Sequence, residues 1–332
     1  MSQTVAVLGS GGWGTAVALL LAHGPRHRVR LWSAHPANAA KLAAERSNAR
    51  LLPGANFPDA LEVTGDARDA VSGADLWVSA IPTTYLRATL GPFAALRAAD
   101  VPVVSLTKGL EVSTFQRPSE IISGVLGTDN IAVLSGPSHA EEVAAGMPTS
   151  VVVAANDGGL AARVQRTFGT DRFRVYTNND LAGVELAGAL KNVIGIAAGV
   201  CDGLGFGDNA KAALLTRGLV EMTRFGIAHG AEQATFNGLA GIGDLMTTCF
   251  SPHGRNRRIG HRLGRGEPLA DVLAGPQVAE GVLTSKSVFE RAARSGIEAP
   301  IMTGVYEMLH TGKSPRAVVQ DLMTRSPKHE RV

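Results

Sequence analysis

The side chain best suited to take part in a reaction is that of Lys191, which lies within the apolar run LAGVELAGALKNVIGIAAGV at 181–200. Small residues recur along this run, which predicts a helix that other helices approach closely. A buried ammonium group needs a partner, or it becomes suited to proton transfer. The alternative is that Lys191 extends to solvent at the helix edge. Because Glu185, Lys191 and Asn192 would be costly inside a bilayer, we expect a buried helix of a soluble protein.

A second chemical signal is GSGGWG at 9–14, between an apolar β-branched run at 4–8 and a helix predicted over 15–22. In this context Gly9, Gly11 and Gly14 permit a tight turn and a close approach of the backbone to a pyrophosphate. The N–H groups at the start of the helix attract the phosphates. The pattern favours a dinucleotide site over an incidental glycine turn.

The sequence does not decide between NAD and NADP at the ribose of that nucleotide. Ser33, Ala34 and His35 follow the second predicted strand, and no acidic residue occurs before Glu45. An acidic residue there would hold the ribose 2′-hydroxyl group of NAD. Its absence removes a repulsion against the 2′-phosphate of NADP, which a protonated His35 could attract; otherwise His35 is an exposed loop residue. NADP is therefore permitted and NAD is not excluded.

Cations recur at two further places. Lys108 directly follows a buried strand predicted over 101–107, and Gly136 follows the next predicted strand. Both therefore lie beyond the carboxyl ends of strands, where parallel sheets bind ligands. We expect Lys108 to meet a phosphate or a substrate oxygen; the alternative is a surface lysine in a turn. A basic cluster at a later helix start comprises Arg255, Arg257, Arg258, Arg262 and Arg265.

That basic cluster favours a small phosphate. A guanidinium group beside the N–H groups of a helix start, as at Arg255-Asn256, suits a phosphate monoester. Nucleic acid would require a longer basic stripe with interleaved aromatic residues, and a solvated basic helix is the remaining alternative.

Two acidic residues each have two interpretations. Asp244 could cap the next helix or pair with Lys191, and Glu280 could bind a nicotinamide amide or start a helix.

Two kinds of architecture must position these residues. Strand-like runs alternate with helical runs up to about residue 177, which predicts a parallel, doubly wound sheet. Only helical patterns follow Asn178. We therefore expect an α/β protein with a Rossmann-like dinucleotide-binding domain over 1–180 and an all-helical substrate domain over 181–332. Asp66 and Ser314 are predicted helix caps.

Composition agrees with this organisation. A chain of 332 residues with 45% hydrophobic residues can form two domains with sizeable cores. The formal charge of +3 does not by itself imply a nucleic-acid partner. Cys201 and Cys249 cannot build a disulfide framework, and the N-terminus lacks the features of an export signal. Both observations favour a reducing cytoplasm.

Six segments also carry a family resemblance. They are GSGGWGTA (9–16), SLTKGLE (105–111), LSGPSHAEEV (134–143), LAGALKNVIGIAAGVCDGLGFGDNAKAALLTRGL (186–219), GLAGIGDLMTTC (238–249) and GRNRRIG (254–260). In this order they resemble the NAD(P)-dependent glycerol-3-phosphate dehydrogenases of the bacterial biosynthetic type. The resemblance implies a cytoplasmic homodimer that reduces dihydroxyacetone phosphate reversibly with NADH or NADPH. Its product, sn-glycerol 3-phosphate, supplies phospholipid synthesis.

The resemblance also implies residue roles. Lys191 matches the proton donor and acceptor, and Lys108 and Asp244 are the other catalytic positions. The substrate positions are Lys108, Gly136, Ser138, Lys191, Asp244, Gly254, Arg255 and Asn256. The cofactor positions are Gly9, Gly11, Gly12, Trp13, Gly14, Ala34, His35, Leu51, Lys108, Ala140, Arg255, Val278 and Glu280. No metal ligand, nucleic acid or membrane span is implied.

Three positions depart from the family pattern. Gly254 stands where serine is common, so only a backbone N–H can reach the phosphate. Leu51 replaces a common aromatic residue, and Ala34-His35 replaces a basic pair, which weakens a strict NADP preference. Two rival functions are a two-domain dehydrogenase for 3-hydroxyacyl or sugar-acid substrates and a non-catalytic NAD(P)-binding sensor. A sensor has no need of a desolvated lysine.

Overall fold

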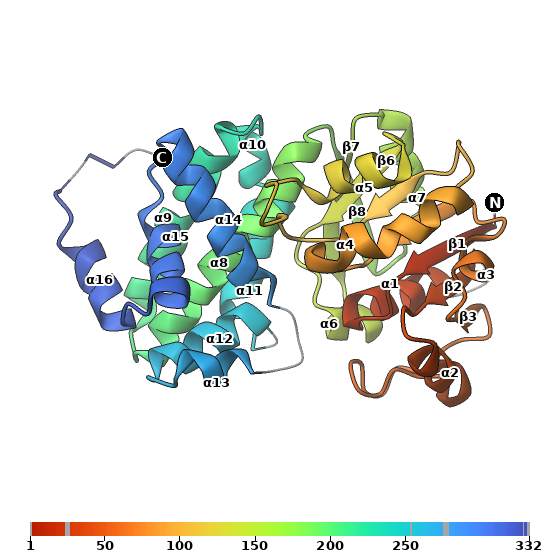
Figure 1. Ribbon diagram of the computed structural model, residues 1–332, viewed down its shortest axis with the longest axis horizontal. Helices are drawn as coiled ribbons and strands as arrows, with labels where there is room; N and C mark the ends of the chain where they lie inside the picture. Colours follow the sequence, from red (N-terminus) through yellow and green to blue (C-terminus); the bar gives the residue numbers. More distant parts are fainter. Residues whose placement is uncertain (1, 24–26, 253, 275–278, 328, 331–332) are drawn as a thin grey trace. The chain divides into compact units, whose positions relative to one another are not determined.

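A computed structural model of the chain describes all residues except 1, 24–26, 253, 275–278, 328 and 331–332 (Figure 1). The chain divides into two compact units. One comprises Met1–Lys108 and Pro118–Leu181, and the other comprises Gly109–Arg117 and Ala182–Val332. The second unit thus includes a segment, Gly109–Arg117, that lies well before the boundary expected near residue 180.

The first unit is built on an eight-stranded sheet of order β3-β2-β1-β4-β5-β6-β7-β8. Its strands are β1 (Gln3–Leu8), β2 (His27–Trp32), β3 (Leu61–Thr64), β4 (Leu76–Ser79), β5 (Val103–Ser105), β6 (Ile131–Ser135), β7 (Thr149–Ala155) and β8 (Phe173–Asn178). The predicted doubly wound α/β sheet is confirmed. The strand order reverses at β1, next to β4, which is where such sheets bind ligands.

One strand pair departs from the all-parallel prediction. β7 runs antiparallel to β6 and parallel to β8. The connection between β6 and β7 contains only the short helix α6 (Ala140–Ala144). A parallel pair needs a crossover that spans the sheet, and this short helix returns the chain along the neighbouring strand instead.

Helices cover both faces of the sheet. Along β1, Val5 and Val7 join a core with α1 (Gly12–Ala22) and α7 (Gly158–Phe168). Ala6 and Leu8 join a second core with α3 (Ala67–Val71), α4 (Thr83–Leu90), η1 (Gly91–Leu96) and α5 (Pro118–Leu126). Burial on both faces explains why these strands are nearly continuous apolar runs. The remaining helix of this unit, α2 (Pro36–Glu45), follows β2.

The described residues of the second unit form helices and connecting turns. The helices are α8 (Leu181–Gly203), α9 (Asp208–Ile227), α10 (Gln233–Phe236), η2 (Leu239–Gly243), α11 (Asp244–Phe250), α12 (Arg255–Gly264), α13 (Leu269–Leu273), α14 (Glu280–Ser295), α15 (Pro300–Tyr306), η3 (Glu307–Thr311) and α16 (Pro315–Met323). Both predicted caps are confirmed. Asp66 accepts the Asp69 N–H at 2.9 Å, and Ser314 accepts the Ala317 N–H at 3.2 Å.

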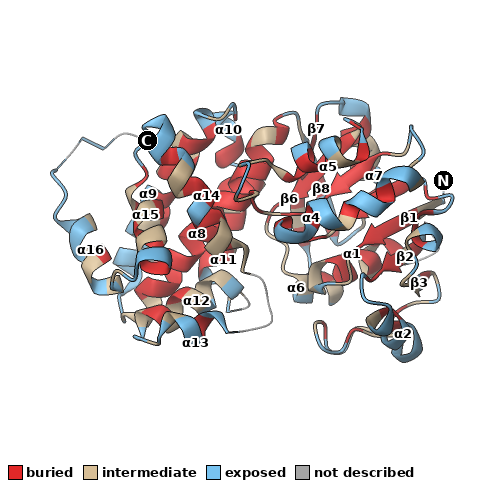
Figure 2. Ribbon diagram, viewed as in Figure 1, coloured by how far each residue is buried: buried red, intermediate tan, exposed pale blue. Residues whose placement is uncertain are grey.

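Helix α8 is the central core element of this unit. Its length and composition would suit a membrane span, but 94% of its most apolar window is buried inside the protein (Figure 2). A β-carbon placed on Gly199 would lie 1.9 Å from the Arg257 carbonyl oxygen, and one on Gly260 would lie 1.9 Å from that of Ile196. The backbones of α8 and α12 are therefore in direct contact, which confirms the close helix approach predicted from the small residues.

Candidate active site

The glycine loop after β1 lies against the end of β4. Gly9 has φ +117°, and a β-carbon there would lie 2.9 Å from the Ala80 carbonyl oxygen. A β-carbon on Gly14 would lie 2.0 Å from the Gly9 carbonyl oxygen, so neither position accepts a larger residue without rearrangement. Apart from its chain neighbours, no described residue has an atom within 4 Å of a β-carbon placed on Gly11. The loop is thus tight on its inner side and open at Gly11, as a phosphate cradle requires.

Three of the predicted cofactor positions meet at the start of α1. A β-carbon on Gly12 would lie 3.9 Å from the β-carbons of both Ala140 and Leu51. The adjacent Trp13 has a buried indole N–H with no hydrogen-bond partner in the described part of the chain. A buried donor without an acceptor is costly, and a bound dinucleotide would supply acceptors. The loop residues therefore fit the pyrophosphate of a dinucleotide.

A neutral hydrogen-bonded group, which sequence reasoning missed, holds this loop to the end of β2. The Ser10 hydroxyl donates to the Ser33 hydroxyl at 2.8 Å, and the Asn38 amide donates to Ser33 at 2.9 Å. The Asn48 amide donates to the Ser10 carbonyl oxygen at 3.1 Å and to the Thr15 hydroxyl at 2.9 Å. The contacts of Ser10 with Ser33 and of Asn48 with Ser10 and Thr15 join residues far apart in sequence, so no local sequence pattern indicated them. Ala34 and His35 beyond them are exposed.

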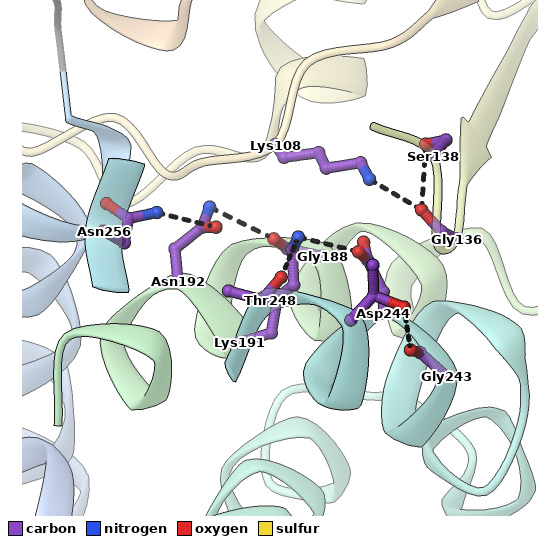
Figure 3. A network of polar contacts seen from close by, with 11 residues as sticks. Lys108, Gly136, Ser138, Gly188, Lys191, Asn192, Gly243, Asp244, Thr248 and Asn256 are labelled. Atoms are coloured by element: carbon purple, nitrogen blue, oxygen red, sulfur yellow. Dashed lines mark hydrogen bonds and ion pairs between the residues drawn. The ribbon is translucent and has the colours of Figure 1, made fainter. Parts of the chain in front are cut away.

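Lys108 meets two other predicted substrate positions in the first unit (Figure 3). Its ammonium group donates to the Gly136 carbonyl oxygen at 3.0 Å, and the Ser138 hydroxyl donates to the same oxygen at 2.9 Å. The neighbouring strands β5 and β6 end beside each other and bring these residues together. Gly136 has φ +131°, which favours glycine at this turn.

Lys191 does not extend to solvent. Its ammonium group donates to Asp244 at 2.7 Å and to Thr248 at 2.6 Å, and only 10% of its side chain is exposed (Figure 3). Pairing with Lys191, one of the two interpretations of Asp244, is therefore present in the structure. Thr248 escaped sequence reasoning. The signal that could have found it is its position four residues after Asp244, since residues four apart in a helix share one face.

Asn256 bridges three helices of the second unit. Its amide donates to the Asn192 side-chain oxygen at 3.0 Å, and its own oxygen accepts the Gly281 N–H at 3.2 Å. The asparagine thereby fixes the starts of α12 and α14 against α8. Glu280 is the first residue of α14, and Val278 lies outside the described residues.

The basic cluster is not a single ligand site. Arg257 pairs with Asp202 at 2.6 Å, and Arg262 pairs with Glu267 at 2.7 Å, so both stabilise the fold. Arg255 is exposed at the first position of α12. Gly254 precedes it and directs its N–H toward the Ser251 carbonyl oxygen at 3.4 Å. Arg255 with the N–H groups that start α12 remains the part of the cluster suited to a phosphate.

The thiol nearest to this site is unreactive. Burial raises the pKa of Cys249 to about 12, although the charge of Lys191 opposes that shift. The thiolate is the reactive form, so Cys249 acts as a small apolar residue on the buried face of α11. Both cysteines are free.

Two family models match consecutive parts of the chain. The N-terminal model of NAD-dependent glycerol-3-phosphate dehydrogenase matches residues 4–161, and the C-terminal model matches residues 180–320. The chain belongs to this family. The resemblance carried by the six sequence segments is therefore confirmed.

Individual relatives agree over almost the whole length. The glycerol-3-phosphate dehydrogenase (NAD(P)+) of Chlorobium limicola is 49% identical over 330 residues, covering 98% of this chain and 99% of that protein. The enzyme of the same name from Geobacillus thermodenitrificans is 46% identical over 332 residues, covering 99% and 96%. The crystal structure of glycerol-3-phosphate dehydrogenase from Coxiella burnetii superposes with a TM-score of 0.93 at 38% identity, covering 98% and 99%. The Rossmann-like unit followed by a helical unit is thus the family's fold.

Proposed function

We propose that this protein interconverts dihydroxyacetone phosphate and sn-glycerol 3-phosphate by hydride transfer with NADH or NADPH. The observation that carries the proposal is the buried Lys191, held by Asp244 and Thr248 in a chain of this family. A lysine so placed can give a proton to a ketone oxygen during reduction and remove it from the alcohol during oxidation.

The first unit would hold the cofactor, which supplies or accepts the hydride when bound. Gly11, Gly12 and the start of α1 receive the pyrophosphate, and the indole N–H of Trp13 gains an acceptor. The remaining cofactor positions, the exposed Ala34 and His35 among them, follow the family pattern. The group of Ser10, Ser33 and Asn38 contains no carboxylate to repel a 2′-phosphate, so both cofactors are accepted.

Proton transfer falls to the second unit in this mechanism. Asp244 and Thr248 fix the Lys191 ammonium group by two hydrogen bonds, which hold the proton at Nζ in a defined direction. A preorganised donor needs no reorganisation when the carbonyl oxygen of the substrate gains charge. Asn192, one residue along α8, is itself fixed by Asn256 and orients the substrate beside the lysine.

The phosphate and the developing alkoxide are stabilised by other groups. Lys108, with Gly136 and Ser138, stabilises the negative charge that develops on the substrate oxygen. Arg255 and the N–H groups at the start of α12 bind the phosphate. Because serine is replaced by Gly254, this phosphate site relies on backbone N–H groups and a guanidinium group. Asn256 contributes by fixing α12.

We further propose a cytoplasmic homodimer whose product feeds phospholipid synthesis, with no nucleic-acid partner. This setting follows the family resemblance. Sedimentation of the purified protein tests the dimer, and a monomer over the whole concentration range would contradict it.

Parallel assays with NADH and NADPH test the activity. The purified protein is mixed with dihydroxyacetone phosphate, and loss of nicotinamide absorbance is followed, with unphosphorylated dihydroxyacetone as the control. We expect oxidation of both cofactors with the phosphorylated substrate only. Cofactor binding without turnover would favour the sensor, and turnover of a 3-hydroxyacyl or sugar-acid substrate alone would favour the other dehydrogenase class.

Substitution of Arg255 tests the phosphate site. A charge-assisted hydrogen bond contributes about 1.5–3 kcal/mol, so Arg255→Ala should raise the KM for dihydroxyacetone phosphate by about 10- to 100-fold. The matched control is Arg258→Ala, which removes an exposed arginine of the same helix. An equal KM in the two variants would remove Arg255 from the phosphate site.

A further inference from the structure

The segment Gly109–Arg117, here called the strap, follows Lys108 directly and packs with the second unit. Lys108 itself packs with the first unit, and the chain rejoins that unit at Pro118, where α5 begins. The chain therefore leaves the first unit immediately after a proposed catalytic lysine. Whatever holds the strap also holds the backbone on the C-terminal side of Lys108.

The strap is a closed turn. The Phe115 N–H donates to the Glu111 carbonyl oxygen at 2.8 Å, and the Glu111 N–H donates to the Gln116 carbonyl oxygen at 3.0 Å. Phe115 has φ +64°, a conformation that a bulky residue seldom adopts. Such a backbone persists only where surrounding contacts impose it, and the Phe115 ring makes several such contacts.

Those contacts come from two helices of the second unit. The Phe115 ring lies 5.8 Å from the ring of the buried Phe225 in α9 and 5.1 Å from the ring of His229, just beyond α9. The guanidinium group of Arg291 in α14 lies 5.2 Å from the centre of the Phe115 ring. Arg291 also donates to His229 at 3.1 Å. Burial lowers the pKa of His229, which keeps the imidazole neutral and able to accept this bond.

A second anchor ties the strap to α8. Arg117 pairs at 3.1 Å with Glu185, whose side chain is fully buried. A buried charge left without its partner is strongly destabilising, so this pair fixes the end of the strap against α8. Glu185 and Lys191 lie on the same helix.

We propose that Phe115 and Arg117 are positioning residues for the dehydrogenase reaction: they anchor the strap to α8, α9 and α14 and thereby fix Lys108 for catalysis. The inference rests on the proposed role of Lys108 in stabilising the alkoxide. A displacement of about 1 Å in such a group can cost about 10²-fold in rate. The anchors therefore act on turnover through Lys108, and they leave nucleotide binding at the glycine loop unchanged.

The test variant is Phe115→Asn. Asparagine accepts the left-handed backbone conformation, so the change removes the ring and keeps the turn. We expect kcat to fall at least tenfold, with the Kd for NADPH unchanged. Phe115→Tyr should keep kcat close to that of the parent protein, because the tyrosine ring can occupy the same place. The matched control is Tyr306→Ala, which removes the stacking of Tyr306 on Phe289 and should lower Tm with kcat unchanged.

A double-mutant cycle separates this role from a general loss of packing. In a Lys108→Ala background, Phe115→Asn should have no further effect on kcat, since its partner in catalysis is gone. A normal kcat in Phe115→Asn, or the same fold-loss in both backgrounds, overturns the inference alone. A normal kcat in Lys108→Ala overturns the proposed function of Lys108 itself. If Phe115→Asn does not fold, Phe115→Leu answers the same question with a smaller expected loss.

Discussion

At the scale of single residues, the site depends on short contacts that fix two ammonium groups. Two oxygens, from Asp244 and Thr248, hold the Lys191 ammonium group, and both come from one face of α11. One backbone oxygen, that of Gly136, receives both Lys108 and Ser138. A single substitution at either place should therefore change chemistry before it changes the fold.

Lys191→Ala should lower kcat by about 10²- to 10⁴-fold, the usual contribution of a positioned acid or base. The Kd for NADPH should be unchanged, because the proposed nucleotide site is the glycine loop of the other unit. Stopped-flow turnover and fluorescence titration measure the two quantities. Lys313→Ala, which removes a lysine paired with Glu307, is the control. Near-normal turnover in Lys191→Ala would end the acid–base assignment.

The neutral group at the end of β2 leads to a prediction on cofactor choice. Ser33→Asp places a carboxylate where the 2′-phosphate of NADP would lie, so the Kd for NADPH should rise by at least about tenfold more than that for NADH. Ser33→Ala controls for the lost hydrogen bonds to Ser10 and Asn38. Equal losses for the two cofactors in Ser33→Asp would show that this position does not face the 2′ group.

At the scale of elements, sequence patterns predicted what local chemistry controls. The β-branched runs, Asp66 and Ser314 marked strands and caps because their signals lie within a few residues. The antiparallel β7 was missed because strand direction depends on the path of α6, which apolar periodicity does not report. The contacts of Asn256 with Asn192 and Gly281 were missed because they span long sequence separations, and its expected place at the phosphate stays a prediction.

The junction of α9 and α15 leads to a prediction on pH. Glu221 of α9 accepts the N–H groups of Ile301 at 2.8 Å and Met302 at 3.1 Å. Burial raises the pKa of Glu221 to about 7, although these hydrogen bonds oppose the shift. A raised folded-state pKa contributes stability that is present below the unfolded value of 4.5 and is lost as pH rises through about 7.

The free energy of unfolding should therefore fall by roughly 2.5 kcal/mol between pH 5 and pH 8 from this group. Glu221→Gln should flatten that dependence, because the amide does not ionise. Urea unfolding at several pH values measures it, with the exposed Glu232→Gln as the control. A Glu221→Gln profile with the same slope as the parent protein would contradict the prediction.

At the scale of the whole molecule, the chain forms two units with different sequence patterns. Strand and helix patterns alternate in the first unit and only helical patterns occur in the second, which made their order predictable. The strap escaped prediction because its anchors, Phe225, His229 and Arg291, lie more than a hundred residues further along the chain. A local sequence pattern does not predict contacts between residues so far apart. Sequence reasoning thus reached the fold and the family, and it missed the contacts that hold the strap to the second unit.

Ligand linkage supplies the prediction at this scale. A ligand that binds only the folded state stabilises it by about 2.7 kcal/mol at a concentration of 100 Kd, so NADPH should raise Tm. Gly14→Ala should abolish that rise, since its β-carbon would displace the Gly9 carbonyl oxygen. Thermal scans with and without NADPH test this, and Gly124→Ala, at an exposed open helix position, is the control. A Tm rise in Gly14→Ala equal to the parent's would contradict the assignment.

Helix α8 has a consequence for the way this chain is made. Synthesis proceeds from the N-terminus, so α8 leaves the ribosome before α9, α11 and α12 exist to cover it. A nascent apolar segment of 23 residues meets the length criterion of a membrane-insertion signal. Near its middle, Lys191 adds about 2.5–3.5 kcal/mol to the free energy of insertion, and Glu185 adds a further cost. The lysine proposed to move the proton therefore also makes insertion of the unfinished chain into a membrane less favourable.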